Sequence, residues 1–215
     1  MKSAKGLICL TSLVILLPVC VGAALWGRLP DPMPTHFNFQ GVPDGWSGKP
    51  FAVFGMPLFL LAVHLVCAFA VFHDPKADNV AGKIRALTLW ICPAVSLFVA
   101  ALTYSYALGG DSVSPNLFGM LFMGALFVVV GNYLPKCRQN YTVGIKLPWT
   151  LADEDNWNRT HRMAGPLWAA GGFLIILDAF LQIYPLWVFC GIPMIAAIAP
   201  VIYSAALYVR KRGQA

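Results

Sequence analysis

Polar side chains are scarce in this chain, and those that could do chemistry gather in two segments and at two isolated positions. In the segment "PTHFNFQGVPDGW", His36, Asn38 and Gln40 alternate with Phe37 and Phe39. This period of two is typical of extended chain, with polar groups on one side and rings on the other. Such a segment could contact a ligand, or its rings could only seal the end of a helical bundle.

The residues that follow predict how this segment folds. Val42-Pro43-Asp44-Gly45 has Pro second and Gly fourth, which favours a type I turn. We therefore expect residues 27–50 to form a folded cap that is partly embedded.

The second polar segment is "NYTVGIKLPWTLADEDNWNRTHRMAG", which begins at Asn140. Asp155 and Arg159 are spaced i,i+4, as are Trp157 and His161, so each pair shares one helix face. With Thr150 as N-cap, the pattern predicts a short interfacial helix over 151–163. Gly165-Pro166 would then turn the chain into the next apolar stretch. The aromatic and cationic side chains here could contact a protein partner, or lipid at the membrane interface.

Asp178 and His64 are the two isolated positions, because both fall within apolar stretches. Asp178 is a functional candidate by default, since an intramembrane charge is costly; it could equally reach the interface or remain neutral inside. His64 is expected to be a packing histidine with satisfied hydrogen bonds. The two lie at different depths, so we do not expect a proton-relay pair.

The motifs expected of an enzyme are missing from the sequence. It contains no HExxH, no phosphate-binding glycine loop and no nucleophile beside a base. No two histidines have ligand spacing with Cys, Asp or Glu, so we expect no metal, no cofactor and no catalysis.

Composition indicates the membrane as the environment of the chain. Only 11% of the 215 residues are charged, against roughly 25% in soluble domains, and the mean hydropathy is +0.69. Apolar stretches of about 20 residues, enough to cross a bilayer, occur six times. They lie near 7–26, 51–72, 86–108, 116–134, 164–183 and 187–208, with the last two joined by a turn at Tyr184-Pro185.

The distribution of cations predicts the orientation. With six spans, thirteen of the fifteen Lys and Arg fall on one side, and only Arg28 and Lys49 on the other. The positive-inside rule makes the cation-rich side cytoplasmic, with both termini there. Anionic inner-leaflet lipid, rather than nucleic acid, is then the expected neighbour of the net charge of +6. The first span also has the outline of a signal peptide, but it is long enough to remain as an anchor.

Two groups of residues carry a resemblance to a known family. The inner group is Gly131-Asn132-Tyr133-Leu134-Pro135-Lys136, Asn140-Tyr141, Gly144-Ile145-Lys146, Pro148-Trp149-Thr150-Leu151, Trp157, Thr160-His161-Arg162, Gly165 and Gly171-Gly172. The outer group is Leu29-Pro30, Pro34, His36-Phe37-Asn38, Gly41 and Pro43-Asp44. With these residues the chain resembles the SdpI-like family of bacterial membrane immunity proteins, together with the N-terminal domain that often accompanies it.

The resemblance implies a non-enzymatic protein of the bacterial plasma membrane that protects against a secreted membrane-active peptide toxin. Because some members also hold a transcription repressor at the membrane, it further implies a cytoplasmic repressor as a partner. For the toxin or ligand, the candidate residues are His36, Phe37, Asn38, Gly41 and Asp44. For a cytoplasmic partner, they are Asn140, Lys146, Trp149, Thr150, Trp157, His161 and Arg162.

The expected fold is an all-α integral membrane protein, a bundle of six transmembrane helices with a structured outer loop and a cytoplasmic interfacial helix. We divide it into an N-terminal region, 1–85, and an SdpI-like region, 86–215, with an inner platform over 135–165. A small transporter with a polar path, or a structural protein that organises lipid, remain alternatives. The sequence predicts no oligomeric state.

Overall fold

The computed structural model describes residues 2–110, 114–183 and 185–213, so Tyr184 of the predicted turn lies outside the described residues. Within these residues, six helices are long and apolar enough to cross a membrane, which confirms the predicted fold class. Their bounds are α1 Lys2–Ala24, α2 Met56–Phe72, α3 Gly82–Ala107, α4 Pro115–Tyr133, α6 Glu154–Leu181 and α7 Pro185–Arg212.

Shorter elements connect these helices. They are the strands β1 Met33–Phe37 and β2 Pro43–Ser47, the π-helix Phe51–Gly55 that leads into α2, the 3₁₀ helices Ala77–Asn79 and Leu134–Lys136, and α5 Pro148–Ala152. The chain packs as two compact units: Met1–Ala70 with Arg85–Phe118, and Val71–Ile84 with Gly119–Ala215. The sequence division at residue 85 stays a prediction.

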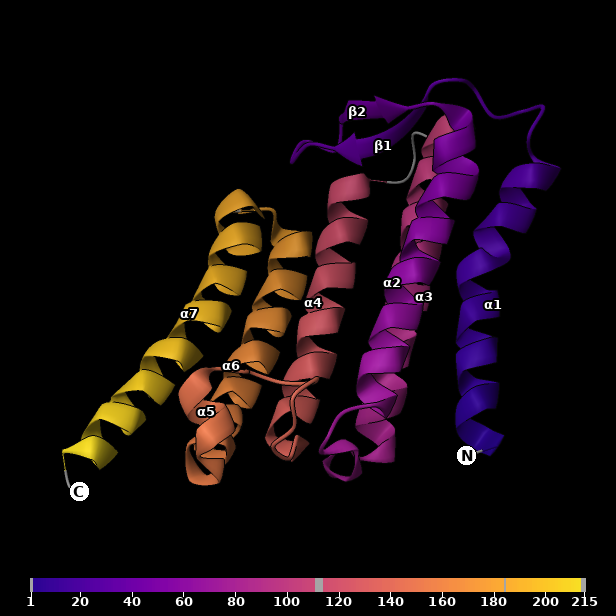
Figure 1. Ribbon diagram of the computed structural model, residues 1–215. Coiled ribbons are helices and arrows are strands. Elements are labelled where there is room, and N and C mark those ends of the chain that lie inside the picture. Colours follow the sequence, from indigo (N-terminus) through magenta and orange to yellow (C-terminus); the bar gives the residue numbers. More distant parts are fainter. Residues whose placement is uncertain (1, 111–113, 184, 214–215) are drawn as a thin grey trace. The chain divides into compact units, whose positions relative to one another are not determined.

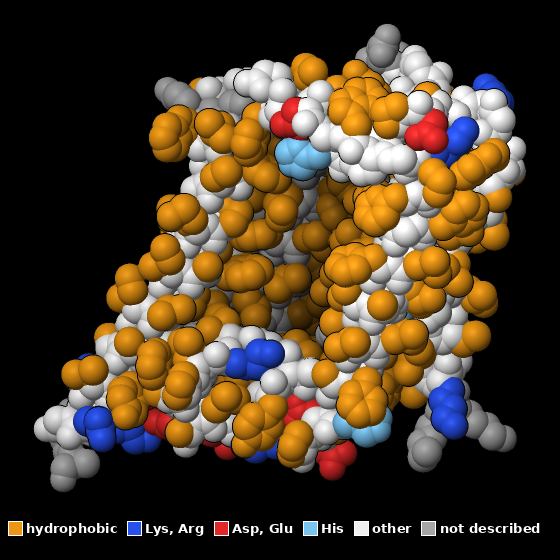
Figure 2. All heavy atoms as spheres, turned by 45° about the horizontal axis from the view of Figure 1, so that its top comes forward, with side chains coloured by type: hydrophobic (Ala, Val, Ile, Leu, Met, Phe, Trp, Pro, Cys, Tyr) orange, Lys and Arg blue, Asp and Glu red, His pale blue; other side chains and the backbone are white. Residues whose placement is uncertain are grey.

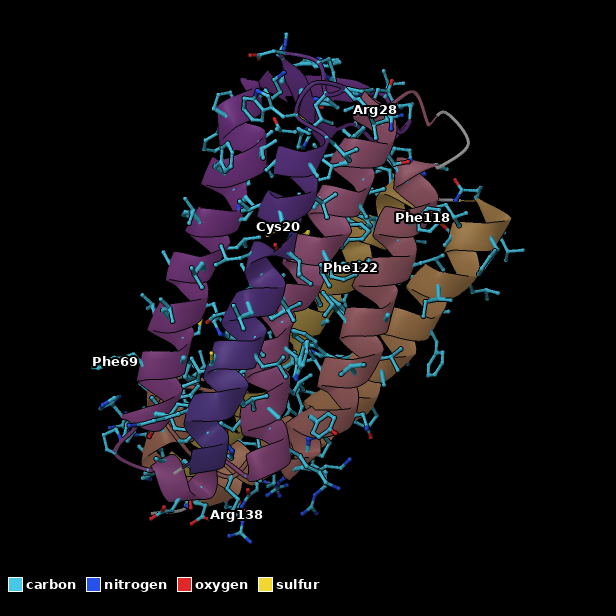
Figure 3. All side chains as sticks on the ribbon, turned by 90° about the vertical axis from the view of Figure 1, so that its right-hand side faces the viewer. Cys20, Arg28, Phe69, Phe118, Phe122 and Arg138 are labelled. Atoms are coloured by element: carbon cyan, nitrogen blue, oxygen red, sulfur yellow. The ribbon has the colours of Figure 1, made fainter. Side chains whose placement is uncertain are left out.

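In the first unit, α1 is joined to α3 by hydrogen bonds from polar side chains of α3 to backbone carbonyls of α1. The Ser96 hydroxyl donates to the carbonyl of Ile15 at 2.9 Å, and the Tyr104 hydroxyl to that of Pro18 at 2.9 Å. The antiparallel pair of β1 and β2 lies across one end of α2 and α3 (Figure 1). Arg28 lies at this same end of the unit (Figure 3).

In the second unit, α6 packs between α4 and α7 (Figure 1), with α5 against its first turns. The helix α6 runs unbroken from Glu154 to Leu181, so it contains most of the predicted helix 151–163 and of the predicted fifth span 164–183, and the expected turn at Gly165-Pro166 is wrong. Membrane helices tolerate an internal proline because neighbouring groups can satisfy the freed backbone. Gly165 instead marks a close contact, since a Cβ there would lie 2.3 Å from Pro135 Cγ.

The surface of the helices matches a lipid environment. Hydrophobic side chains cover the lengths of the helices, whereas charged side chains gather at their ends (Figure 2). Phe69, for example, is 65% exposed and points away from α2 (Figure 3). A water-soluble protein rarely exposes so continuous an apolar surface.

Candidate functional site

The hairpin of β1 and β2 presents one ionisable pair to its surroundings. His36 Nδ1 lies 2.5 Å from Asp44 Oδ1, and the two side chains are 71% and 45% exposed. The strands bring them together because His36 pairs with Gly45 at an irregularity in the register. Two predicted ligand residues, eight positions apart, are thereby held as one polar unit on the surface.

The loop of the hairpin lies at residues 38–42, so the type I turn predicted over 42–45 is wrong. Pro43 and Asp44 belong to β2 instead. Asn38 Oδ1 accepts the amides of Gln40 and Val42, each at 3.0 Å, and so closes the loop. Gly41 completes it with a φ of 76°, which favours glycine. Asn38 and Gly41 therefore fix the conformation of the loop and do not offer side-chain groups to a ligand.

The alternation predicted over residues 36–40 is confirmed for His36 and Phe37, but it is wrong beyond them, because β1 ends at Phe37 and the residues that follow belong to the loop. Phe37 packs edge-on against Tyr106 of α3, with ring centroids 5.4 Å apart, while His36 faces outward. Around the exposed pair, Val42 and Trp46 are each 54% exposed. The hairpin thus combines a polar pair with apolar side chains, which is suited to contact with an amphipathic peptide.

At the second candidate site, the platform, the buried side chain of Asn140 forms four hydrogen bonds with backbone groups. Its amide nitrogen donates to the carbonyls of Arg138 and Val143, at 2.8 and 3.0 Å. Its oxygen accepts the amides of Thr142 and Val143 at 2.9 and 2.7 Å. All the bonding capacity of this side chain is used within its own loop, and it is 1% exposed. Asn140 cannot present its amide group to a partner.

Trp157 and His161 are also buried, and all their side-chain polar atoms form hydrogen bonds inside the protein. Their rings stack at 4.1 Å, as their helical spacing predicted. The Trp157 indole donates to the Cys137 carbonyl at 2.8 Å. His161 Nε2 accepts the Ile145 amide at 2.8 Å, so its proton is on Nδ1, which donates to the Trp157 carbonyl at 2.8 Å. This histidine is neutral and has both nitrogens occupied.

Thr150 does not cap the helix that the sequence assigned to it. It lies inside α5, where its oxygen accepts the Leu147 amide at 2.9 Å and its hydroxyl donates to the Ile145 carbonyl at 3.0 Å. The N-cap of α6 is Asp153, whose carboxylate accepts the Asp155 amide. Asp153 was missed because its acidic neighbours made it look like part of the first helical turn.

The predicted partner residues therefore separate into a buried set and an exposed set. Asn140, Thr150, Trp157 and His161 are buried, and Lys146 and Arg162 are exposed. Trp149 is partly buried, and its indole donates to Ser204 of α7 at 2.9 Å. The buried set builds the platform, and only the exposed residues remain available to a partner.

The structure adds Asp74 and Gln139, which sequence reasoning had not singled out. The Gln139 amide nitrogen donates to the carbonyls of Thr150 and Leu151, at 2.9 and 3.0 Å, and its oxygen accepts from Lys76. One Asp74 oxygen accepts the Lys76 amide at 2.7 Å, and the other accepts the Tyr141 amide at 2.9 Å and the Thr142 hydroxyl. Gln139 lies beside the motif residue Asn140, but nothing in the sequence marks Asp74.

The environment of Asp74 predicts a pH dependence of stability. Burial alone would raise the pKa of this carboxyl, but the hydrogen bonds from Thr142, Lys76 and Tyr141 together lower the pKa below its ordinary value of 3.8. A depressed pKa in the folded state contributes stability above the unfolded pKa, and that stability is lost as pH falls through the folded value. We expect the thermal unfolding temperature of the protein in detergent to fall as the pH is lowered from about 5 to below 3.8.

Asp74→Asn should lower the unfolding temperature at neutral pH and flatten its acid dependence. Asp78→Asn is the matched control, because Asp78 is an exposed aspartate of the same loop. An identical acid profile in wild type and Asp74→Asn would contradict the assignment.

The two intramembrane polar residues have structural contacts. His64 is fully buried in the first unit, with Nε2 3.0 Å from the Thr11 hydroxyl. Its Nδ1 has no hydrogen-bond partner among the described residues, so the prediction of satisfied hydrogen bonds is correct for one ring nitrogen and wrong for the other. In the second unit, Asp178 Oδ1 accepts the Ile183 amide at 3.1 Å, just beyond the end of α6. No group of three His, Cys, Asp or Glu in the described ranges is arranged to hold a metal ion.

Both candidate sites lie in regions of the chain that match known protein families. Residues 136–204, which contain nearly all of the platform, match the SdpI/YfhL protein family. Residues 13–61, which contain the hairpin, match a domain of unknown function (DUF1648). The SdpI-like resemblance stated from the sequence is thus confirmed.

The similarity also extends over almost the whole chain. The Immunity protein SdpI of Bacillus subtilis (strain 168) is 22% identical over 206 residues, which cover 94% of this chain and 95% of that protein. No solved structure matches the chain. The SdpI/YfhL match and the DUF1648 match thus occur together in this multi-pass membrane protein.

Proposed function

We propose that this protein is a membrane immunity protein that protects a bacterial cell against a secreted, membrane-active peptide. The observation that carries the proposal is the similarity to Immunity protein SdpI over 94% of the chain. That similarity spans the DUF1648 match and the SdpI/YfhL match alike. The proposal places the protein in the plasma membrane with both termini inside, as the positive-inside rule predicts.

The hairpin is the proposed contact surface for the peptide. It exposes the pair of His36 and Asp44 beside the apolar side chains of Val42 and Trp46. A membrane-active peptide carries both polar and apolar groups, so this surface offers complementary chemistry to each. The rigidity of the loop, closed by Asn38, reduces the entropy that binding would cost.

The proposal includes a second, cytoplasmic contact for a signalling partner such as a transcription repressor. Lys146 and Arg162 are the exposed residues of the predicted partner set. Surface cations of this kind favour an acidic partner and accelerate its association. No observation on the described residues favours the transporter alternative: within the first unit, His64 and Tyr104 each bond separately to α1, at Thr11 and Pro18.

The test is protection of a cell from which the gene is deleted and then restored. Cells are challenged with a panel of secreted peptide toxins, and the concentration that stops growth is measured. His36→Ala and Asp44→Ala should each lower that concentration by about tenfold, as expected for a truncated hot-spot residue. Asn38→Ala is unsuitable, since it would open the loop itself.

Lys146→Ala and Arg162→Ala are the controls, and both should leave protection intact while altering the response of a cytoplasmic partner. Membrane abundance of each variant is measured by immunoblot. Full protection by His36→Ala and Asp44→Ala at normal abundance would refute the hairpin as the contact surface. A restored wild-type gene that protects against none of the toxins would count against immunity itself.

A further inference from the structure

A cavity of about 370 Å³ lies in the second unit where the start of α6 meets the end of α7. Its volume is sufficient for a small polar headgroup. The lining residues are Asp153, Asp155, Asn156, Arg159, Leu207, Arg210 and Lys211. Neither the hairpin nor the exposed Lys146 and Arg162 take part in it.

The charges of the cavity leave one cation available. Lys211 Nζ lies 2.7 Å from Asp153 Oδ2, and Arg159 Nη1 lies 3.6 Å from Asp155 Oδ2. Arg210 lines the same cavity and forms no ion pair with any residue that the structure describes. The two carboxylates are therefore each paired with one cation, and the third cation, Arg210, remains available to bind an anion.

The helix beside the cavity carries an apolar face that continues away from it. Ile195, Ile198, Ile202 and Val209 of α7 are 58%, 48%, 64% and 68% exposed, and their spacing places them along one side of the helix. In a membrane protein such a face contacts acyl chains. The cations of the last turn gather at the end of this face (Figure 2).

Aromatic side chains at the same end of α7 indicate that this end lies at the depth of the lipid headgroups. Trp149 and Tyr208 stack with ring centroids 5.9 Å apart, and Arg212 lies 5.4 Å over the Tyr208 ring. Trp and Tyr concentrate where hydrocarbon gives way to headgroups. An anion that reaches this cavity from the membrane would thus arrive at the correct depth.

We propose that the cavity binds the headgroup phosphate of an anionic phospholipid, with Arg210 as its phosphate contact and the acyl chains along the exposed face of α7. Arginine suits this role because its planar guanidinium can donate two parallel hydrogen bonds to phosphate. A soluble phosphate or an acidic peptide offers the same charge but leaves the apolar face of α7 uncovered. The site is independent of the proposed immunity function, since it uses no hairpin residue.

The test measures lipid binding to the full-length protein in uncharged detergent by native mass spectrometry. We expect phosphatidylglycerol to be retained in preference to phosphatidylcholine. Arg210→Gln should weaken phosphatidylglycerol binding about fivefold, consistent with roughly 1 kcal/mol for each basic residue near an anionic lipid. The matched control is Arg138→Gln, which removes the same charge from an exposed residue outside the cavity (Figure 3).

A second variant changes binding in the opposite direction. Asp155→Asn removes the carboxylate that faces Arg159, so phosphatidylglycerol should bind about fivefold more tightly. Inorganic phosphate and a polyglutamate peptide at equal charge concentration should not displace the lipid. Equal retention of the two lipids, equal loss in Arg210→Gln and Arg138→Gln, no gain in Asp155→Asn, or displacement by either competitor would overturn the proposal.

Discussion

Replacing Gly131 by alanine is expected to destabilise the second unit by about 3 kcal/mol, at the upper end of the cost of overpacking. A Cβ at this position of α4 would lie 2.5 Å from the backbone nitrogen of Ala169 and 2.7 Å from the carbonyl oxygen of Gly165 on α6. Both atoms belong to the backbone, so no side chain can rotate away. The two helices would have to separate.

The same contact recurs one heptad away, where Gly124 of α4 faces Gly172 of α6. A Cβ on Gly172 would lie 2.5 Å from the Gly124 oxygen and 2.7 Å from the Val128 nitrogen. Small residues let membrane helices approach closely, because packing rather than hydrophobic burial drives their association in lipid. Gly172→Ala should therefore cost about as much as Gly131→Ala.

Thermal unfolding in detergent checks this prediction, together with the yield of folded protein. Gly119→Ala is the control within α4, because a Cβ there meets nothing within 4 Å. We expect that variant to unfold at or slightly above the wild-type temperature, since alanine favours a helix more than glycine does. If Gly131→Ala and Gly119→Ala had the same stability, the close approach of α4 and α6 would be wrong.

Trp157→Ala is expected to cost about 3–5 kcal/mol, the range for large buried aromatics. The side chain is fully buried in a cluster with Val71, Val80, Ile84 and Cys137. Its removal leaves a cavity, removes the stacking partner of His161 and leaves the Cys137 carbonyl without its indole donor.

A milder variant separates the packing of Trp157 from its hydrogen bond. Trp157→Phe keeps one aromatic ring and much of the packing but loses the indole N–H, so it should cost less than Trp157→Ala, with about 1–3 kcal/mol from the buried acceptor left unsatisfied. Trp187→Ala is the control, because Trp187 is 76% exposed on α7 and should change stability by less than about 0.5 kcal/mol. The measurement is again the free energy or temperature of unfolding in detergent.

The outcome also decides between two roles for the residues shared with the SdpI-like family. If Trp157→Ala unfolds the platform, the matched tryptophan and histidine are structural, as their burial indicates. A stable Trp157→Ala protein that fails only to recruit a partner would instead restore the partner-contact hypothesis drawn from the sequence.

Amino-acid order by itself determined which segments enter the membrane. Whether a stretch such as 86–108 can cross a bilayer depends on the summed transfer free energy of its own residues, and its helix requires no partner to satisfy its backbone. The i,i+4 pairs were predictable for the same reason, because helix geometry alone places Trp157 beside His161. Family resemblance followed from the same local information.

The tertiary structure alone decided which polar residues are buried and what they bind. The Ile145 amide is satisfied by His161, sixteen residues away, and the Tyr141 amide by Asp74, sixty-seven residues away. Gly131 reveals its role only when α6 is placed against it. Burial and hydrogen-bond partners depend on how distant segments pack, and a pattern within one segment carries no information about that packing. For this reason the sequence located the platform but assigned its buried residues to a partner.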